Sequence, residues 1–443
     1  MSGIAAGIRN GIPFRGRSKS RPKEKPLEYT LLLTATMCLL TFGAVMVFSA
    51  SSSASLLNDG DSLAFLKKTL MFGAVGLIGM KIISMQRLAD VRRLTGTFLI
   101  AAVGLLLVTK VMGSSANGAQ RWLEFGPIQI QSSEIAKLAL VLYGVSMLTD
   151  RPQLTRDLHS MRPILLVAGA VCALIVVEPD LGTAMVTAFS MAALLIAGGA
   201  KIRHLAIIAG LLLLLVVVAV AMEPYRMERL TTFINPGADA AGAGFQSQQA
   251  SIALGSGGIF GVGIGESVQK AFYLPEAHTD MIAAVIGEEL GLIGISLLVG
   301  LYMLLGYAGF RTAQKAKDRY GRLLAAGLTA MILVQASINL FAVLGLAPLT
   351  GVTLPFVSYG NSSLIMTLAA VGLLLNVANG GRAGAASARS GRRLRVVDGG
   401  ASTRRAPQTR RPAARGGSRA GGDRSRRHSG ARGAGAGRRR RAR

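Results

Sequence analysis

Residue types that build metal centres, disulfides and charged protein surfaces are scarce in this 443-residue chain. Its two cysteines, Cys38 and Cys172, both lie in apolar runs, which argues against a disulfide framework and against a thiolate metal site. Four histidines in the whole chain argue equally against a multi-histidine centre. Only 16% of the residues are charged, compared with roughly a quarter in soluble proteins. The chain is therefore not an ordinary soluble protein.

Acidic residues are also few: 22 Asp and Glu stand against 49 Lys and Arg, for a net charge of +27. A charge this high suggests a nucleic-acid binder when it covers a folded surface. Here, residues 1–28 carry a net +5, and residues 379–443, with twenty arginines and two acids, carry a net +18. We therefore expect a basic tail at 1–28, a disordered Arg/Gly-rich tail at 379–443, a nearly neutral body at 29–378, and no nucleic-acid partner.

The body consists largely of long apolar runs. Hydrophobic residues make up 51% of the chain, and a bilayer core of ~30 Å requires roughly 20 apolar residues in helical form. The sequence predicts an all-α, polytopic integral membrane protein with ten transmembrane helices and no cleaved signal peptide. The predicted spans are residues 29–50, 66–85, 96–113, 134–149, 163–178, 181–199, 203–222, 281–309, 322–347 and 354–378.

Lys and Arg lie on alternate loops between these spans. They are frequent in both tails and around residues 87–93, 151–162, 201–203 and 311–322, whereas the intervening loops contain few. The positive-inside rule then places both termini in the cytoplasm, which requires an even number of spans. The large external loop between the seventh and eighth helices, residues 223–280, contains six aromatic residues, so we expect it to be functional rather than disordered.

Ionisable residues at membrane depth are costly and are functional candidates by default. A first cluster holds Arg121 and Trp122 at the outer interface, followed by Glu134 and Lys137, which are three residues apart and can pair on one helix face. This cluster could be an interfacial tryptophan with a structural ion pair, or a substrate-binding site. In a second cluster, Asp180 could cap the sixth span or contact the long loop.

A third cluster lies where the long loop meets the eighth span. Its glycines do not form a dinucleotide-binding motif, because the third glycine and a preceding strand are missing. Asp280 is the foremost candidate. A carboxylate at this boundary is solvated enough to ionise, and nearby apolar groups raise its proton affinity, as a general base requires. The alternative is that Asp280 or Thr279 caps the helix. His278 and Glu276 could join Asp280 around a divalent ion, and at least one of Glu288 and Glu289 must face the bundle interior.

A segment rich in proline, glycine and hydroxyl groups precedes the last span and includes Pro355, Ser358 and Asn361. Irregular backbone at membrane depth is tolerated only where it is buried in protein or lines a cavity, so we expect a broken helix entry here. Together, the clusters indicate a multi-span protein with a polar external site at the lipid boundary, suited to a lipid-linked substrate.

Motifs in all of these clusters resemble the SEDS family (shape, elongation, division and sporulation), in the family's order and over residues 29–378. They are GAQRW at 118–122 with QSSExxK at 131–137, EPDLGT at 178–183, LPEAHTD at 274–280 with GEELG at 287–291, and LPFVSYGNSS at 354–363. The LPEAHTD form resembles the division (FtsW) branch more than the elongation (RodA) branch. Ser132 stands where the family often has proline, and Asn361 where it usually has a second glycine.

This resemblance implies an inverting peptidoglycan glycosyltransferase that polymerises lipid II into glycan strands at the outer face of the cytoplasmic membrane, in septal cell-wall synthesis. Asp280 would be its general base, undecaprenyl pyrophosphate the leaving group, and a class B penicillin-binding transpeptidase its partner, alongside other division proteins and membrane lipids. No metal is assigned, although a Mg or Mn ion near Asp280 could assist the leaving group. Substrate-binding candidates are Arg121, Lys137, Glu134, Lys270, Gln269, Glu276, His278 and Ser358, with Trp122, Asp180, Glu288, Glu289, Pro355 and Asn361 in supporting positions.

Two other functions stay open. A flippase that moves lipid II across the membrane would use charges near the midplane, such as Glu134 and Lys137. A non-catalytic scaffold of the division machinery would not need Asp280. Polymer synthesis that depends on Asp280 separates both from the glycosyltransferase.

Overall fold

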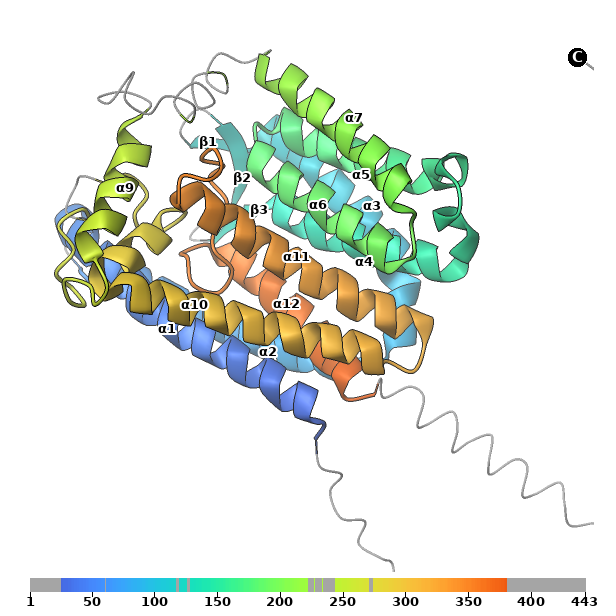
Figure 1. Cartoon of the computed structure of the whole chain (residues 1–443), viewed down its shortest axis with the longest axis horizontal. Coiled ribbons are helices and arrows are strands. Elements are labelled where there is room, and N and C mark those ends of the chain that lie inside the picture. The colour runs from blue at the N-terminus through green and yellow to red at the C-terminus, as the bar shows by residue number, and fades with distance from the viewer. Residues whose placement is uncertain are drawn as a thin grey trace, which may run out of the picture. The chain divides into compact units, whose positions relative to one another are not determined.

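The computed structural model describes residues 25–59, 61–116, 119–125, 128–221, 227, 233, 244–270 and 274–380 (Figure 1). The predicted tails up to residue 24 and from residue 381, and most of residues 222–243, lie outside the described residues. The helices are α1 (Leu27–Asp59), α2 (Ala64–Met85), α3 (Leu88–Met112), α4 (Ser132–Asp150), η1 (Pro152–Thr155), α5 (Leu158–Val177), α6 (Leu181–Ala197), α7 (Ile202–Ala221), α9 (Phe245–Gly257), α10 (Ile282–Lys315), α11 (Arg319–Val343) and α12 (Asn361–Ala378). The strands are β1 (Ser114–Ala116), β2 (Ala119–Phe125) and β3 (Ile128–Gln131).

Each predicted span overlaps a helix of the structure. Within the described residues, seven helices are long and apolar enough to cross a membrane: α1, α2, α3, α5, α10, α11 and α12. Helices α4, α6 and α7 occupy the other three predicted positions without meeting that criterion. The chain is thus a mainly helical, multi-pass membrane protein, and the count of ten spans stays a prediction.

Helices α11 and α12 are the most enclosed of the apolar helices. Of their most apolar stretches, 72% and 83% of residues are buried, compared with 17% in α2. Helix α12 packs against α2 and α11, while α10 lies between α1 and α11 (Figure 1). Outward-facing side chains such as Ile100 of α3 are apolar and exposed, as expected of a surface that meets lipid rather than water.

A small antiparallel sheet, in the order β1-β2-β3, departs from the purely helical prediction. It occupies residues 114–131, between the third and fourth predicted spans. In its register Leu123 faces Ile130, Glu124 faces Gln129 and Trp122 faces Gln131. The apolar pair Leu123–Ile130 and the polar pair Glu124–Gln129 stabilise this hairpin. The sheet leads directly into α4 and so fixes where that helix begins.

The irregular segment before the last span is also observed. Helix α12 begins at Asn361 rather than at residue 354, and residues 351–360 are not helical. Pro355 has no N–H to give to a helix, and Phe356 has a left-handed φ of 68°. Most of the segment is buried against α1, α10 and α11, with the hydroxyl of Tyr302 donating to Pro355 O at 2.5 Å. We call residues 351–360 the entry segment.

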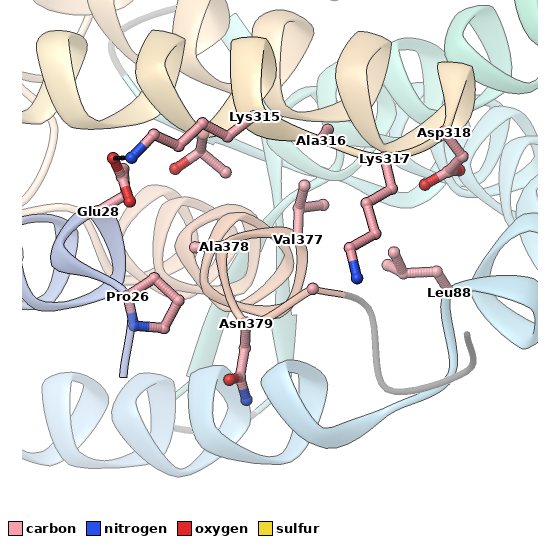
Figure 2. A pocket seen from close by; sticks show the side chains of 12 residues that line it. Pro26, Glu28, Leu88, Lys315, Ala316, Lys317, Asp318, Val377, Ala378 and Asn379 are labelled. Carbon is pink, nitrogen blue, oxygen red and sulfur yellow. Dashed lines mark ion pairs between the residues drawn. The ribbon is translucent and has the colours of Figure 1, made fainter. Parts of the chain in front are cut away.

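The basic loops meet at one end of the bundle. Lys315 at the end of α10 pairs with Glu28 at the start of α1 at 2.5 Å, and Arg92 at the start of α3 pairs with Asp150 at the end of α4. Figure 2 shows the Lys315–Glu28 pair beside a cavity of about 350 Å³, into which Lys317 extends. All of these segments belong to the loops predicted to be cytoplasmic, so the predicted charge asymmetry corresponds to one physical end of the described bundle.

Candidate functional site

Asp280 lies at the other end, immediately before α10. The N-cap of α10 is Met281, whose side chain makes no capping hydrogen bond. The N-cap position is therefore not Asp280 or Thr279, the two residues offered for it by the sequence. The residue is held for another reason: the side-chain amide of Asn339, on α11, donates to Asp280 O at 2.8 Å and to Val352 O at 2.7 Å.

The Asp280 carboxylate faces the entry segment. A Cβ placed on Gly351 would lie 3.9 Å from Asp280 Oδ2, and the φ of Gly351 is 68°, a value that favours glycine. The hydroxyl of Thr279 lies 3.3 Å from Asp280 Oδ1 and 2.9 Å from Glu276 Oε2. Asp280 is half-buried, so its carboxylate sits at a boundary between solvent and protein, as the sequence predicts.

His278 is enclosed by aromatic rings. Its ring centroid lies 4.5 Å from that of Phe65 on α2 and 5.7 Å from that of Tyr359, whose N–H donates to His278 O at 2.9 Å. Burial lowers the pKa of His278, and the Glu276 carboxylate opposes that change. The imidazole therefore links the long loop to α2 and the entry segment.

The described residues do not form a metal site around Asp280. No group of three or more His, Cys, Asp or Glu converges anywhere in the part of the chain that the structure describes. His278, one of the three predicted ligands, packs against two rings instead. We assign no catalytic step to a divalent ion on this basis, and the predicted ion stays a prediction.

The predicted Glu134–Lys137 pair is confirmed. Lys137 Nζ lies 2.6 Å from Glu134 Oε2 and 2.6 Å from Gln335 Oε1, and the whole group is buried. The amide nitrogen of Gln335 donates to Thr353 O at 3.0 Å and to Ser363 Oγ at 3.2 Å. The ion pair thus connects α4, through α11, to the entry segment and α12.

The turn between α5 and α6 is a second buried polar network. Asp180 caps α6 by accepting from Thr183 N at 3.1 Å, which confirms the capping interpretation. Its other oxygen accepts from Ser133 Oγ at 2.7 Å and Gln131 Nε2 at 2.9 Å, so the turn is tied to β3 and α4. These contacts tie Asp180 to the sheet side of the bundle, and most of the long loop, the other predicted partner, lies outside the described residues.

Glu178 and Arg121 complete this turn. Burial raises the pKa of Glu178 to about 7, with the Ser132 hydroxyl opposing and Asp180 adding to the change. A terminal nitrogen of Arg121 donates to Pro179 O, whereas its Nε is buried and has no hydrogen-bond partner among the described residues. The Arg121 side chain is half-buried, and its enclosed Nε is a polar atom left without a described partner.

A third buried network contains Lys270, Glu288 and Glu289. Both glutamates are buried, which confirms and extends the prediction that at least one faces inward. Lys270 Nζ pairs with Glu289 Oε1 at 2.8 Å. Within the described residues, the hydrogen-bond partners of Lys270 are Ser49, Gly265 and Glu289, and those of Lys137 are Glu134 and Gln335, so these two predicted phosphate-binding lysines lie in separate hydrogen-bond networks.

The remaining candidates have structural contacts. Ser358 Oγ accepts from Leu354 N at 2.8 Å inside the entry segment. Gln269 N approaches Glu288 Oε1 at 3.4 Å, and its side-chain oxygen is buried without a described partner. Trp122 lies in β2, and Asn361 is the buried first residue of α12.

Sequence reasoning missed two amides, Gln335 and Asn339. They are four residues apart on α11, share one face of that helix, and reach the ion pair and Asp280 respectively. Polar side chains with this spacing inside a predicted span are themselves a signal of function. That signal was present in the sequence.

A family model described as FtsW/RodA/SpoVE, cell cycle protein, matches residues 29–382. The chain belongs to this family. This is the SEDS family that the motifs indicate, and the match covers the whole predicted ten-span body.

Known members of the SEDS family align with most of the chain. This chain is 42% identical over 353 residues to the probable peptidoglycan glycosyltransferase FtsW of Thioalkalivibrio sulfidiphilus, and the alignment covers 78% of this chain and 88% of that protein. It is 39% identical over 350 residues to stage V sporulation protein E of Bacillus subtilis, covering 78% and 96%.

Solved structures of the family share the fold. A chain from a peptidoglycan synthase complex, studied for the coordination of polymerization and crosslinking, aligns with a TM-score of 0.65 and 31% identity over 78% of this chain and 96% of that one. The rod shape determining protein RodA of Thermus thermophilus aligns with a TM-score of 0.58 and 29% identity over 78% and 95%.

Proposed function

We propose that this SEDS protein is a peptidoglycan glycosyltransferase that polymerises lipid II at the outer face of the cytoplasmic membrane. The position of Asp280 carries the proposal: a half-buried carboxylate at the end opposite the basic loops, held by Asn339 and facing the entry segment. The name of the FtsW relative in Thioalkalivibrio sulfidiphilus supports the same activity.

In the proposed reaction, Asp280 takes the proton of the acceptor sugar hydroxyl. The resulting oxygen attacks the anomeric carbon of the growing strand, a C–O bond forms with inversion, and the bond to undecaprenyl pyrophosphate breaks. Arg121, a half-buried cation, is our candidate to bind the leaving pyrophosphate through its terminal guanidinium nitrogens. Lys137 already shares its charge with Glu134, so its role is to keep a neutral, ordered network beneath the site.

The same proposal includes orientation and partners. Both termini face the cytoplasm, because the described basic loops gather at one end and positively charged loops favour that side. A class B penicillin-binding transpeptidase would crosslink the strands, supported by the solved relative from a peptidoglycan synthase complex. The resemblance of residues 274–280 to the division branch favours a septal location.

The second candidate is a lipid II flippase. It is favoured by one observation, the fully enclosed Glu134–Lys137–Gln335 group, because buried charges inside a helical bundle can mark a transport pathway. The pair is neutralised within the protein, and Asp280 lies outside the span at its outer end. These features fit surface catalysis better than transport.

The deciding experiment uses the full chain with its transpeptidase partner and labelled lipid II in detergent. The wild type should yield glycan polymer, and Asp280→Asn should lose roughly 10²–10⁴-fold in rate, the usual contribution of a general base. Asp61→Asn is the matched control, because Asp61 is an exposed carboxylate paired with Lys67 before α2. Its activity should match the wild type.

Three outcomes contradict the proposal. A wild type that makes no polymer but moves lipid II across vesicle membranes is a flippase. If Asp280→Asn makes polymer at the wild-type rate, Asp280 has no catalytic role. If the wild type and Asp280→Asn are both inactive in the polymerisation assay and in the lipid II transport assay, the scaffold function is favoured. Chelation with EDTA in the same polymerisation assay tests the predicted divalent ion.

A further inference from the structure

Helix α10 is broken near its start, and the long loop fills the break. Gly291 has non-helical angles, φ 63° and ψ −158°. The groups freed by this break pair with residues 258–263 instead of with the helix. The bonds are Val262 N to Glu288 O at 2.9 Å, Gly263 N to Glu289 O at 3.0 Å, Leu292 N to Gly258 O at 3.0 Å and Ile293 N to Ile259 O at 3.3 Å.

The close approach depends on glycine. A Cβ on Gly261, whose φ is 81°, would collide with the Glu289 carbonyl, and a Cβ on Gly291 would lie 2.5 Å from Gly261 N. Two backbones can pack this tightly only without side chains between them. The loop is therefore built to lie against this turn of α10.

Side chains complete the attachment. The Glu288 carboxylate accepts from Ser267 Oγ and from Val268 N at 3.1 Å. Lys270 Nζ contacts Glu289 Oε1 at 2.8 Å, Gly265 O at 2.7 Å and Ser49 Oγ of α1 at 3.1 Å. Ser49 in turn donates to the Glu289 carboxylate at 2.6 Å. We call residues 258–270 the loop clamp.

Lys270 is fully engaged within the protein. Its ammonium group has three donors, and the three oxygens just named can take all of them. It is 7% exposed, and its partner Glu289 is 0% exposed. Glu289 is seven residues beyond the first residue of α10, roughly 10 Å along the helix axis, so Glu289 and the lysine paired with it lie about two turns away from the helix start beside Asp280.

We propose that the loop clamp fixes the first part of α10, and through it Asp280, and that Lys270 and Glu289 are positioning residues rather than ligands of the pyrophosphate. The proposal rests on the proposed function of Asp280. Residues 282–290 form a short helical segment between Asp280 and the break at Gly291. The orientation of this segment therefore depends on the hydrogen bonds made by Glu288 and Glu289. The loop clamp sets that orientation, because Lys270 and Glu289 both bind Ser49 of α1.

Neutral substitutions separate positioning from ligand binding. Lys270→Met leaves Glu289 buried and unpaired, and Glu289→Gln leaves Lys270 unpaired, whereas the double variant removes both charges. We expect each single variant to lower kcat by roughly tenfold with KM for lipid II within about twofold. The double variant should recover to within about threefold of the wild-type kcat, because coupled residues are non-additive.

Lys67→Met is the matched control, since Lys67 is an exposed lysine in an ion pair near the same end. Its kinetics should equal those of the wild type. A Lys270→Met protein with raised KM and unchanged kcat, or a double variant no better than the worse single one, makes Lys270 a ligand and overturns the proposal.

Amide hydrogen exchange tests the loop clamp independently of enzymatic activity. In Lys270→Met, the amides of Val262, Gly263, Leu292 and Ile293 should exchange faster than in the wild type, whereas those of α11 should not change. Unchanged exchange at these four amides overturns the clamp. If the wild type made no polymer while these amides responded, the proposed function would fail and the clamp would stand.

Discussion

Buried carboxylates in this protein differ in what compensates their burial. Glu134 and Glu289 each face a lysine, and Asp180 caps a helix. Among the described residues, the hydrogen bonds to the Glu178 carboxylate come from the Ser132 hydroxyl, at 3.1 Å from both oxygens, and the charges of Lys110 and Arg121 act on it more weakly. Desolvation therefore dominates at Glu178 and raises its pKa to about 7.

This gives Glu178 a defined pH dependence. Between pH 4.5 and about 7 the folded protein keeps a proton that the unfolded chain releases, so stability is greatest on the acid side and is lost as pH rises. The loss should reach about 3 kcal/mol, at about 1.4 kcal/mol per unit of pKa. Glu178→Gln should flatten this part of the thermal-unfolding profile in detergent from pH 5 to 8.

The control for this experiment is Glu124→Gln, on β2. Glu124 is exposed, and its carboxylate contacts Gln129 Nε2 at 3.3 Å. Its pH profile should follow that of the wild type. An equally steep profile for Glu178→Gln would show that another group titrates in this range.

At the scale of elements, the entry segment depends on how closely its neighbours approach. Gly43 of α1 packs against it: a Cβ there would lie 2.7 Å from Val357 Cα and closer still to Phe356 O. Asn339 of α11 holds it from another side through Val352 O. The segment is non-helical yet ordered because surrounding helices satisfy its backbone groups.

Gly43→Ala should therefore destabilise the protein, although alanine is the better helix former. Backbone atoms must move to admit the methyl group, and such overpacking costs about 1–3 kcal/mol. Gly79→Ala on α2 is the matched control, because no atom lies within 4 Å of its Cβ position. It should be neutral or stabilising by up to about 1 kcal/mol.

Unfolding in detergent, followed by tryptophan fluorescence, measures both variants, since Trp122 is the single tryptophan. Equal unfolding midpoints for Gly43→Ala and Gly79→Ala would mean that the entry segment moves to admit the methyl group with no loss of stability. Polymerisation by Gly43→Ala should also fall, because the entry segment faces Asp280.

At the scale of the described bundle, the basic loops and Asp280 occupy opposite ends. The basic loops meet at the end where α12 ends, and Asp280 lies at the other. Polybasic segments beside a membrane helix attract anionic headgroups and acidic partners. We therefore expect the Arg-rich tail to act on placement rather than on catalysis.

Removal of residues 390–443 should leave the polymerisation rate in detergent unchanged. It should weaken binding to vesicles that contain anionic lipid, because the deleted part holds most of the basic charge of the tail. Vesicle flotation at low and high salt, beside the polymerisation assay, measures both effects. Loss of polymer synthesis on truncation would contradict this division of roles.

Local features of the chain were determined by the sequence itself. Apolar runs located the helices, three-residue spacing predicted that Glu134 and Lys137 can pair, and the turn before α6 offered Asp180 as a possible cap, both of which the structure confirms. These follow from helix periodicity and short-range hydrogen bonds, which do not depend on the rest of the fold.

Contacts between distant residues were decided only by the tertiary structure. Lys270 pairs with Glu289 and with Ser49, 221 residues away, and Asn339 reaches Asp280 across 59 residues. A buried charge or amide must find a partner somewhere, but which partner depends on how the helices pack, and periodicity carries no information about that. The packing therefore decided that Lys270 lies within the clamp and that Asp280 stands beside the entry segment.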